Sequence, residues 1–222
     1  MKYKCLVLDH DDTVVDSTAS IHFPCFISYL GDYHKHLVGK YTLESFLEKN
    51  FSPGIIPFYR DEIGLSDEQI KLEEDYWREY VKGHIPKAYD GMREIIERFI
   101  SHGGIVAVSS HSFRHYIERD YRENCLPTPN DIFGWELERE KRKPSTYAID
   151  TLIEKYSLSR EQILVVDDLK TGFDMARSAG VPFAASGWAY DVPIIEAFMR
   201  EHCDFYLETV EDLYRLLFDE EE

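Results

Sequence analysis

Three short apolar runs in this chain each end abruptly in polar residues. The runs cover residues 5–8, 105–108 and 163–166, and the polar residues that follow them are Asp9, Ser109 and Asp167. A continuous apolar run of this length is typical of a strand that is buried on both faces, as in a parallel sheet. The sequence therefore predicts three central strands with polar side chains at their carboxyl ends.

Amphipathic segments separate these runs. Residues 93–101 and 146–155 carry apolar side chains at helical spacing, so strands and helices alternate along the chain. This alternation indicates an α/β fold with a Rossmann-like, doubly wound parallel sheet, in which ligands bind outside the carboxyl ends of the strands. Weaker signals predict further short strands at residues 131–135, 182–185 and 204–207.

The first two apolar runs are about ninety residues apart, which is far more than one crossover helix needs. Residues 17–86 are rich in aromatic residues and helix formers, so we expect a small inserted α-helical cap domain. Turn signals at residues 52–54 and 90–91 mark a break in the insertion and the return to the core. The expected domains are a core of residues 1–16 and 87–222 and a cap of residues 17–86.

The formal net charge is −17 at pH 7, and part of it lies in an acidic tail at residues 219–222. A charge of this sign repels polyanions, so we expect no nucleic-acid partner. No apolar run approaches the roughly 20 residues that cross a bilayer, and the chain does not begin with a signal peptide's apolar stretch. The four cysteines are widely spaced, which argues against a zinc site or a disulfide framework. We therefore expect a cytoplasmic protein with no membrane partner.

Carboxylates gather directly after the first and third apolar runs. Asp9, Asp11 and Asp12 follow the first run, and Asp167 and Asp168 follow the third. Such a cluster is costly unless protons or a cation neutralise it. Mg²⁺ suits this position because it prefers oxygen ligands and combines one or two carboxylates with substrate phosphate. The sequence therefore predicts Mg²⁺ as a cofactor.

The order of these residues resembles that of the haloacid dehalogenase (HAD) superfamily, in its phosphatase branch with a helical cap between the first two motifs. The segments that carry the resemblance are Asp9-x-Asp11-x-Thr13 for the first motif, Ser109 for the second, Lys143-Pro144 for the third, and Asp167-Asp168 followed by Ala179-Gly180 for the fourth. The Ser and the Lys are weak signals by themselves. All four in this order are a strong one.

The resemblance implies a Mg²⁺-dependent phosphatase that hydrolyses a small phosphate monoester, so its partner would be a small phosphorylated metabolite. Asp9 would be the nucleophile that forms an aspartyl-phosphate, and Asp11 the general acid and base. The metal would be held by Asp9, the backbone carbonyl of Asp11 and Asp168. Asp167 would be either a further ligand or a supporting residue.

Binding of the phosphoryl group requires positive charge and hydrogen-bond donors. The resemblance implies that Lys143 offsets the repulsion between the phosphate and Asp9, and that Ser109, Ser110 and backbone N–H groups bind the phosphoryl oxygens. Asp11 must hold a proton when the substrate arrives. We therefore expect neighbouring carboxylates or burial to raise its pKa.

Several positions depart from the family pattern. Asp12 stands where a glycine is frequent, His10 where an apolar residue is usual, and Gly172 where many relatives have another acidic residue. His10, His22 and His111 are left out of the predicted catalytic set, because a lone histidine is more often structural.

Other functions remain open at this point. A phosphomutase of the same superfamily would use a cap histidine, for which His22 is a candidate, although such mutases often have Val at the position of Thr13. A dehalogenase, a phosphonatase, a phospho-acceptor signalling module and a non-catalytic binding protein each fit the motifs less well. The sequence leaves the physiological substrate and the oligomeric state undetermined.

Overall fold

The core of the protein is a six-stranded parallel sheet. The computed structural model describes residues 2–218, so the acidic tail at residues 219–222 lies outside the described residues. The strands lie in the order β5-β4-β1-β6-β7-β8. Their bounds are Cys5–Leu8 (β1), Ile105–Ser109 (β4), Asp131–Phe133 (β5), Ile163–Asp167 (β6), Phe183–Ser186 (β7) and Phe205–Leu207 (β8). This confirms the predicted Rossmann-like sheet and its weaker strands.

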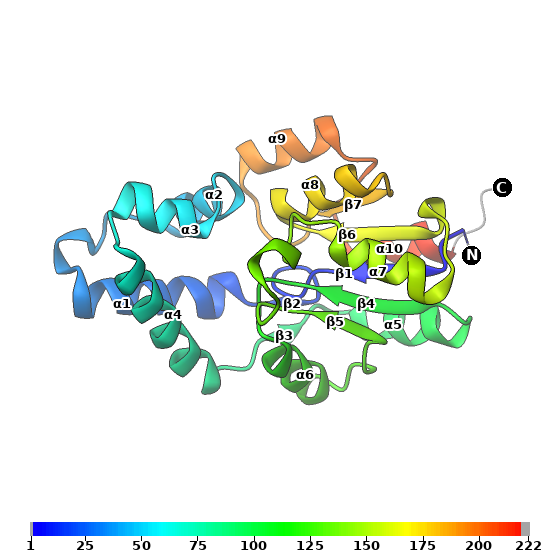
Figure 1. Cartoon of the computed structure of the whole chain (residues 1–222), viewed down its shortest axis with the longest axis horizontal. Coiled ribbons are helices and arrows are strands. Elements are labelled where there is room, and N and C mark those ends of the chain that lie inside the picture. The colour runs from blue at the N-terminus through cyan, green and yellow to red at the C-terminus, as the bar shows by residue number, and fades with distance from the viewer. Residues whose placement is uncertain (1, 219–222) are drawn as a thin grey trace.

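Helices cover both faces of this sheet (Figure 1). They are α5 (Met92–Ser101), α6 (Arg114–Glu123), α7 (Tyr147–Tyr156), α8 (Lys170–Ala179), α9 (Pro193–His202) and α10 (Val210–Phe218), with single turns at Arg139–Lys141 and Arg160–Gln162. In residues 2–218, none of the helices combines the length and the apolar character needed to span a membrane.

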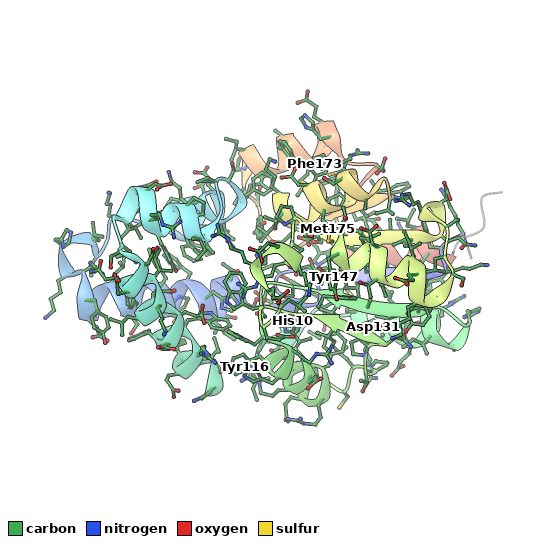
Figure 2. The ribbon with its side chains drawn as sticks, in the orientation of Figure 1. His10, Tyr116, Asp131, Tyr147, Phe173 and Met175 are labelled. Atoms are coloured by element: carbon green, nitrogen blue, oxygen red, sulfur yellow. The ribbon has the colours of Figure 1, made fainter. Side chains whose placement is uncertain are left out.

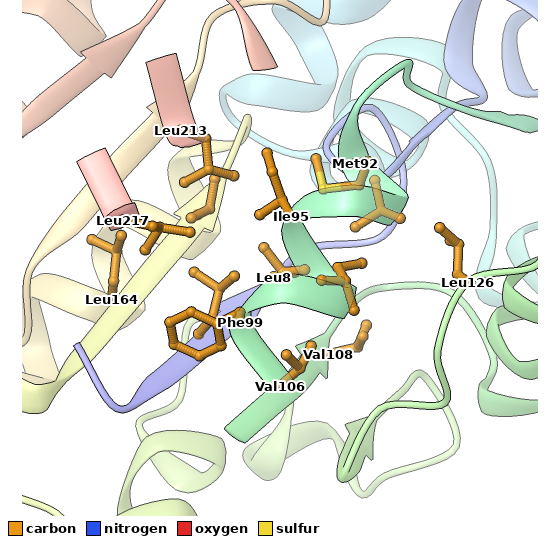
Figure 3. Packing of buried hydrophobic residues seen from close by; sticks show 14 of the residues in the cluster. Leu8, Met92, Ile95, Phe99, Val106, Val108, Leu126, Leu164, Leu213 and Leu217 are labelled. Carbon is orange, nitrogen blue, oxygen red and sulfur yellow. The ribbon is translucent and has the colours of Figure 1, made fainter. Parts of the chain in front are cut away.

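Successive side chains of β1 point to opposite faces of the sheet, so they are buried in two separate hydrophobic cores. Leu6 and Leu8 pack with residues of α5 and α10 on one face, as Figure 3 shows for Leu8. Cys5 and Val7 point to the other face, where α7, α8 and α9 pack. Full burial of one such aliphatic side chain stabilises the fold by roughly 1.5–3 kcal/mol. Because both faces are apolar, polar chemistry is confined to the ends of the strands.

The insertion between β2 (Val15–Asp16) and β3 (Lys87–Ala88) is helical and forms a lobe beside the sheet (Figure 1). The two short strands pair antiparallel where the chain leaves and re-enters the core. The lobe contains α1 (Phe23–Tyr33), α2 (Leu43–Phe51), α3 (Ile55–Pro57), α4 (Asp67–Lys82), π-helical turns at Thr18–His22 and Phe58–Ile63, and a 3-10 turn at Lys35–Leu37.

The lobe has an aromatic core of its own. The ring of Phe26 on α1 lies 4.9 Å from that of Phe46 and 5.8 Å from that of Phe58, measured between centroids. Phe26, Phe46 and Phe58 are all buried. The packing explains why this segment is rich in aromatic residues, and we refer to residues 17–86 as the cap.

One acidic side chain is buried inside the cap. Glu73 of α4 is 8% exposed, and its Oε1 accepts a hydrogen bond of 2.9 Å from the hydroxyl of Tyr59. Burial raises the pKa of Glu73 from 4.5 to about 7, although the bond from Tyr59 acts in the opposite direction. A buried carboxylate without a cation beside it is destabilising, which makes Glu73 a candidate for a function other than stability.

We expect Glu73 to make the stability of the protein fall as pH rises. Between pH 4.5 and 7 the native state holds a proton on Glu73 that the unfolded chain has already released, so ionisation favours unfolding. Relative to the variant Glu73→Gln, the wild type should lose about 3 kcal/mol of unfolding free energy across this interval and nothing further above it. Urea unfolding of both proteins from pH 4 to pH 8 measures the difference. The control variant Glu79→Gln, on the exposed side of the same helix, should show the same pH dependence of unfolding free energy as the wild type. A difference in unfolding free energy between wild type and Glu73→Gln that stays constant with pH would contradict the prediction.

Candidate active site

A cavity of about 160 Å³ lies between the cap and the carboxyl ends of the central strands. Its core side is formed by Asp9, Asp11, Asp12, Ser110, His111, Ser112, Phe113, Trp135, Lys143, Asp168 and Leu169. Leu8 of β1 pairs with Val108 of β4 and Val166 of β6. This register brings the residues after the three strands to one edge of the sheet, as the sequence predicts.

Lys143 joins the ends of two strands by ion pairs. Its Nζ lies 2.8 Å from Oδ1 of Asp9 and 2.6 Å from Oδ2 of Asp167, and all three side chains are buried. Burial by itself would lower the pKa of Lys143, but the carboxylates of Asp167 and Asp9 raise it above its ordinary value. Lys143 is therefore a permanent cation beside Asp9.

Three carboxylates surround this single ammonium group. Oxygens of Asp9, Asp167 and Asp168 lie within 4.8 Å of one another, so the buried cluster has a formal charge of −2 once Lys143 is included. Burial raises the pKa of Asp167 to about 7 with help from the charge of Asp9 and against the charge of Lys143. Burial and the charges of Asp9 and Asp167 raise the pKa of Asp168 well above its usual value. Acidic oxygens at this density, with a deficit of two positive charges, fit one divalent cation. The cluster does not include the carboxylate of Asp11.

The two aspartates at the end of β6 have different partners. Both oxygens of Asp167 are occupied, since Oδ2 binds Lys143 and Oδ1 accepts a 2.8 Å bond from the backbone N–H of Leu169. Asp168 accepts a bond of 2.9 Å at Oδ2 from the hydroxyl of Tyr190, and Oδ1 lies 3.5 Å from Oγ1 of Thr13. Asp168 also lines the cavity, whereas Asp167 does not.

Asp11 faces the cap instead of the acidic cluster. Its Oδ1 lies 2.9 Å from Nε2 of His22, and its Oδ2 accepts a 2.5 Å bond from the hydroxyl of Ser112. The indole N–H of Trp77 on α4 donates to Nδ1 of His22 at 3.0 Å. An indole N–H can only donate, so Nδ1 keeps its lone pair and the proton of the neutral ring is assigned to Nε2, which donates to Asp11.

These contacts overturn the expectation that the pKa of Asp11 is raised. Burial acts in that direction, but His22 and Ser112 outweigh it and lower the pKa. Asp11 in turn raises the pKa of His22 against the effect of burial. A second proton on His22 would end its bond with Trp77, so this bond opposes the rise in the pKa of His22.

The two serines after β4 differ in direction. The hydroxyl of Ser109 points to the sulfur of Met175 on α8 at 3.8 Å, and Ser109 is not among the residues that line the cavity. Figure 2 shows Met175 on the side of the sheet covered by α8. Ser110 lines the cavity, and its Oγ accepts a bond of 3.0 Å from the backbone N–H of Ser112. The structure thus brings Ser110, and not Ser109, to the predicted site.

Departures from the family pattern have local explanations. Asp12 has a left-handed backbone (φ 56°), and its Oδ1 accepts bonds from the N–H groups of Ser17 and Thr18 at 3.1 and 3.0 Å. Asp is one of the few residues with a side chain that tolerate this conformation. A Cβ on Gly172 would lie 2.1 Å from Oδ2 of Asp167, so the oxygen that binds Lys143 depends on the absence of a side chain there.

The three histidines have distinct environments. His10 is buried beside Asp120 of α6, with Nε2 at 3.1 Å from Oδ2, and it does not line the cavity (Figure 2). Burial and the charge of Lys143 lower the pKa of His111 to about 4, so this ring is neutral at physiological pH. His22, by contrast, contacts a predicted catalytic residue. Sequence reasoning named His22 only as a mutase candidate and missed the contacts of Trp77, Ser112 and Tyr190, which come from distant elements and follow no motif.

Comparison with known proteins is consistent with this site. The family model of the haloacid dehalogenase-like hydrolases matches residues 6–186. No curated protein sequence matches the chain significantly.

Among solved structures, a haloacid dehalogenase-like protein from Bacteroides fragilis has a TM-score of 0.78 at 19% identity, covering 96% of this chain and 100% of the other. A predicted phosphatase from Clostridium acetobutylicum has a TM-score of 0.78 at 16% identity, covering 99% and 100%. A predicted phosphoglycolate phosphatase from Haemophilus somnus has a TM-score of 0.69 at 18% identity, covering 98% and 99%. These likenesses show a common fold. With the family match over most of its length, the chain belongs to the haloacid dehalogenase-like hydrolase family.

Proposed function

We propose that this hydrolase is a phosphatase that cleaves small phosphate monoesters through an aspartyl-phosphate on Asp9. The observation that supports it best is the pair of ion contacts from Lys143 to Asp9 and Asp167 beside the cavity. Two unit negative charges about 4 Å apart repel by roughly 4 kcal/mol at an effective dielectric of 20, so a phosphate dianion needs adjacent cations to approach Asp9. Lys143 supplies one of them.

In the first step, a carboxylate oxygen of Asp9 attacks phosphorus and the ester oxygen leaves as an alcohol after taking a proton from Asp11. In the second step, water attacks the phosphorus of the acyl phosphate, gives one proton back to Asp11 and releases inorganic phosphate and the free Asp9 carboxylate. Lys143 binds phosphoryl oxygens in both steps. Of the two serines expected to bind phosphate, we assign this role to Ser110, since Ser110 alone of the two lines the cavity.

Ser112 can accommodate both protonation states of Asp11. Its hydroxyl donates a hydrogen bond to Oδ2 when Asp11 is ionised. When Asp11 is protonated at Oδ2, the hydroxyl of Ser112 can rotate and accept a hydrogen bond from it. His22 continues to donate to Oδ1 in both states. The arrangement therefore supports a general acid and base at Asp11: its resting form is ionised, and it takes up the proton from solvent when the negative charge of a bound phosphate raises its proton affinity.

We further propose Asp9, Asp168 and the backbone carbonyl of Asp11 as the groups that hold Mg²⁺. When bound, the ion would neutralise the charge of the cluster and of the incoming phosphate. Both oxygens of Asp167 already accept hydrogen bonds, one of them from Lys143, so we assign it the task of positioning Lys143. The substrate is proposed to be a small phosphorylated metabolite, because the cavity is smaller than the few hundred Å³ usual for larger ligands.

The remaining assignments are also proposals. Residues 1–16 and 87–222 would form the core domain and residues 17–86 the cap domain, which the pairing of β2 with β3 at the crossing supports. The net charge of −17 favours a function without nucleic acid. Cytoplasmic location stays a prediction from the sequence.

One contact favours a phosphomutase as the second candidate. His22 of the cap lies 2.9 Å from Asp11, the position expected for a histidine that controls this acid. Thr13 stands against it, because mutases often have Val there. Incubation with hexose 1-phosphate separates the two functions, since a mutase yields an isomeric sugar phosphate and a phosphatase yields inorganic phosphate.

Replacement of the nucleophile tests the proposed chemistry. Asp9→Asn removes the attacking carboxylate, so Mg²⁺-dependent release of phosphate from p-nitrophenyl phosphate should fall by at least about 10³-fold, as for other covalent nucleophiles. The release should also stop when EDTA is added to the wild type. Equal rates for wild type and Asp9→Asn would refute Asp9 as the nucleophile.

The two serines offer a matched test of phosphate binding. Ser110→Ala should lower kcat/KM about 10- to 100-fold, because it removes one donor to the phosphoryl oxygens. Ser109→Ala makes the same chemical change at a buried position directed at Met175, and it should alter kcat/KM by less than about 3-fold. Steady-state kinetics with p-nitrophenyl phosphate decide between them, and the opposite ranking would return the role to Ser109.

A further inference from the structure

The cap side of the cavity is apolar and acidic. Apolar walls come from Phe46 and Ile55 and from Ile70 and Trp77 of α4, while Glu73 of the same helix supplies a carboxylate. A leaving group attached to a phosphate on Asp9 would extend into this half, because the core side holds the groups that bind the phosphoryl oxygens. The chemistry of this half therefore selects the leaving group.

The aromatic hydrogen-bond donors around the cap half of the cavity already donate to acceptors within the protein. The hydroxyl of Tyr59 donates to Glu73, and the indole N–H of Trp77 donates to His22. On the core side, the indole N–H of Trp135 donates across the cavity to Oε2 of Glu74 of the cap at 3.1 Å. Apart from the amide of Asn50 and the hydroxyl of Thr18, the described lining on the cap side thus offers a ligand acceptors and aromatic faces instead of donors.

Apart from His22, which is bound to Asp11, the described lining on the cap side has no basic side chain. Lys143 lies on the core side and is bound to two aspartates. Two guanidinium groups contact lining residues without lining the cavity themselves: Arg142 stacks 4.0 Å from the ring centroid of Trp135, and Arg78 lies 4.0 Å from Glu74. A second anionic group on the substrate would therefore meet Glu73 without a counter-ion.

Glu73 is the charged group best placed to recognise a ligand. It lines the cavity, it is 8% exposed, and Tyr59 is the one partner that the described residues provide for it. Burial has already removed water from this carboxylate, which strengthens its attraction for a cation. A group with an ammonium nitrogen would supply the missing donors and the missing positive charge together.

We propose that the substrate is an aminoalkyl phosphate monoester whose ammonium group is bound by Glu73, with the aromatic side chains of Trp77 and Trp135 forming the adjoining wall. This assignment rests on the proposed phosphatase function and narrows its substrate class. A polyol leaving group fits less well because its hydroxyls need donors as well as acceptors. A leaving group with a carboxylate, such as that of phosphoglycolate, fits least because its negative charge would face Glu73.

Three esters of similar size test the assignment. 2-Aminoethyl phosphate and n-propyl phosphate differ in an ammonium group against a methyl group, and 2-phosphoglycolate has a carboxylate in the same place. Hydrolysis is measured at pH 8 with Mg²⁺, for the wild type, for Glu73→Gln and for Glu79→Gln. Glu79 is the matched control, because it lies on the same helix with an exposed side chain and pairs with Lys82 on the surface.

The wild type and Glu79→Gln should prefer the aminoethyl ester over the propyl ester by at least about 10-fold in kcat/KM, the value of one charge-assisted hydrogen bond. Phosphoglycolate should be the poorest of the three. In Glu73→Gln the ratio of aminoethyl to propyl ester should fall to near one. Equal kcat/KM values for these two esters in the wild type, a preference that survives in Glu73→Gln, or phosphoglycolate as the best ester would each overturn the assignment.

Failure of the proposed function gives a different result. If wild type and Asp9→Asn release phosphate equally from p-nitrophenyl phosphate, the phosphatase function itself is wrong. If that release depends on Asp9 but the three esters show no preference for the ammonium group, the phosphatase function stands and the assignment to Glu73 falls. The ratio in the wild type decides this without depending on the folding of any variant.

Discussion

The ammonium group of Lys143 between Asp9 and Asp167 is the interaction on which the rest of the site depends. A nucleophilic carboxylate must be buried to be shielded from water, yet burial of several carboxylates together is unfavourable without positive charge. Lys143 offsets one of the three charges in the cluster and leaves a deficit that matches a divalent ion. The smallness of Gly172 keeps Asp167 where Lys143 can reach it. The same imbalance would destabilise an ordinary core, and here it suits the metal and the phosphate that we propose for this site.

Much of the fold and part of the site could be predicted, because the end of a buried strand is marked in the sequence by a change from apolar to polar residues. Continuous apolar runs that stop at Asp9 and Asp167 imply parallel strands in register, and their pairing through Leu8 and Val166 places the two aspartates at one edge. There is an equally simple reason why Ser110, and not Ser109, lines the cavity. Residues of β4 alternate, so Ser109 lies on the same face as Ala107 and meets α8, and the residue beyond the strand faces the cavity. Attention to this alternation would have separated the two serines, which we expected from the sequence to act together.

The environment of Asp11 could not be predicted in the same way. Its partners are His22, which a π-helical turn delivers from the start of the cap, and Ser112, which lies 101 residues away in sequence. Neither contact follows from periodicity, because each depends on how the cap is seated against the core. The expected pKa of Asp11 was wrong for that reason. Neighbouring carboxylates suggested a raised value, whereas donors from outside the motif lower it.

The position of the cap against the core also connects the proposed selection of the substrate with the proposed role of Asp11. Trp77 of α4 lines the leaving-group side of the cavity and at the same time holds Nδ1 of His22, which holds Asp11. The end of α4 is in turn fixed to the core, since Arg119 of α6 donates to the backbone carbonyls of Val81 and His84. A leaving group that displaces the indole of Trp77 would release His22 and change the donors at Asp11. The proposed proton donor Asp11 therefore depends, through one histidine, on the same helix whose Glu73 is proposed to bind the leaving group.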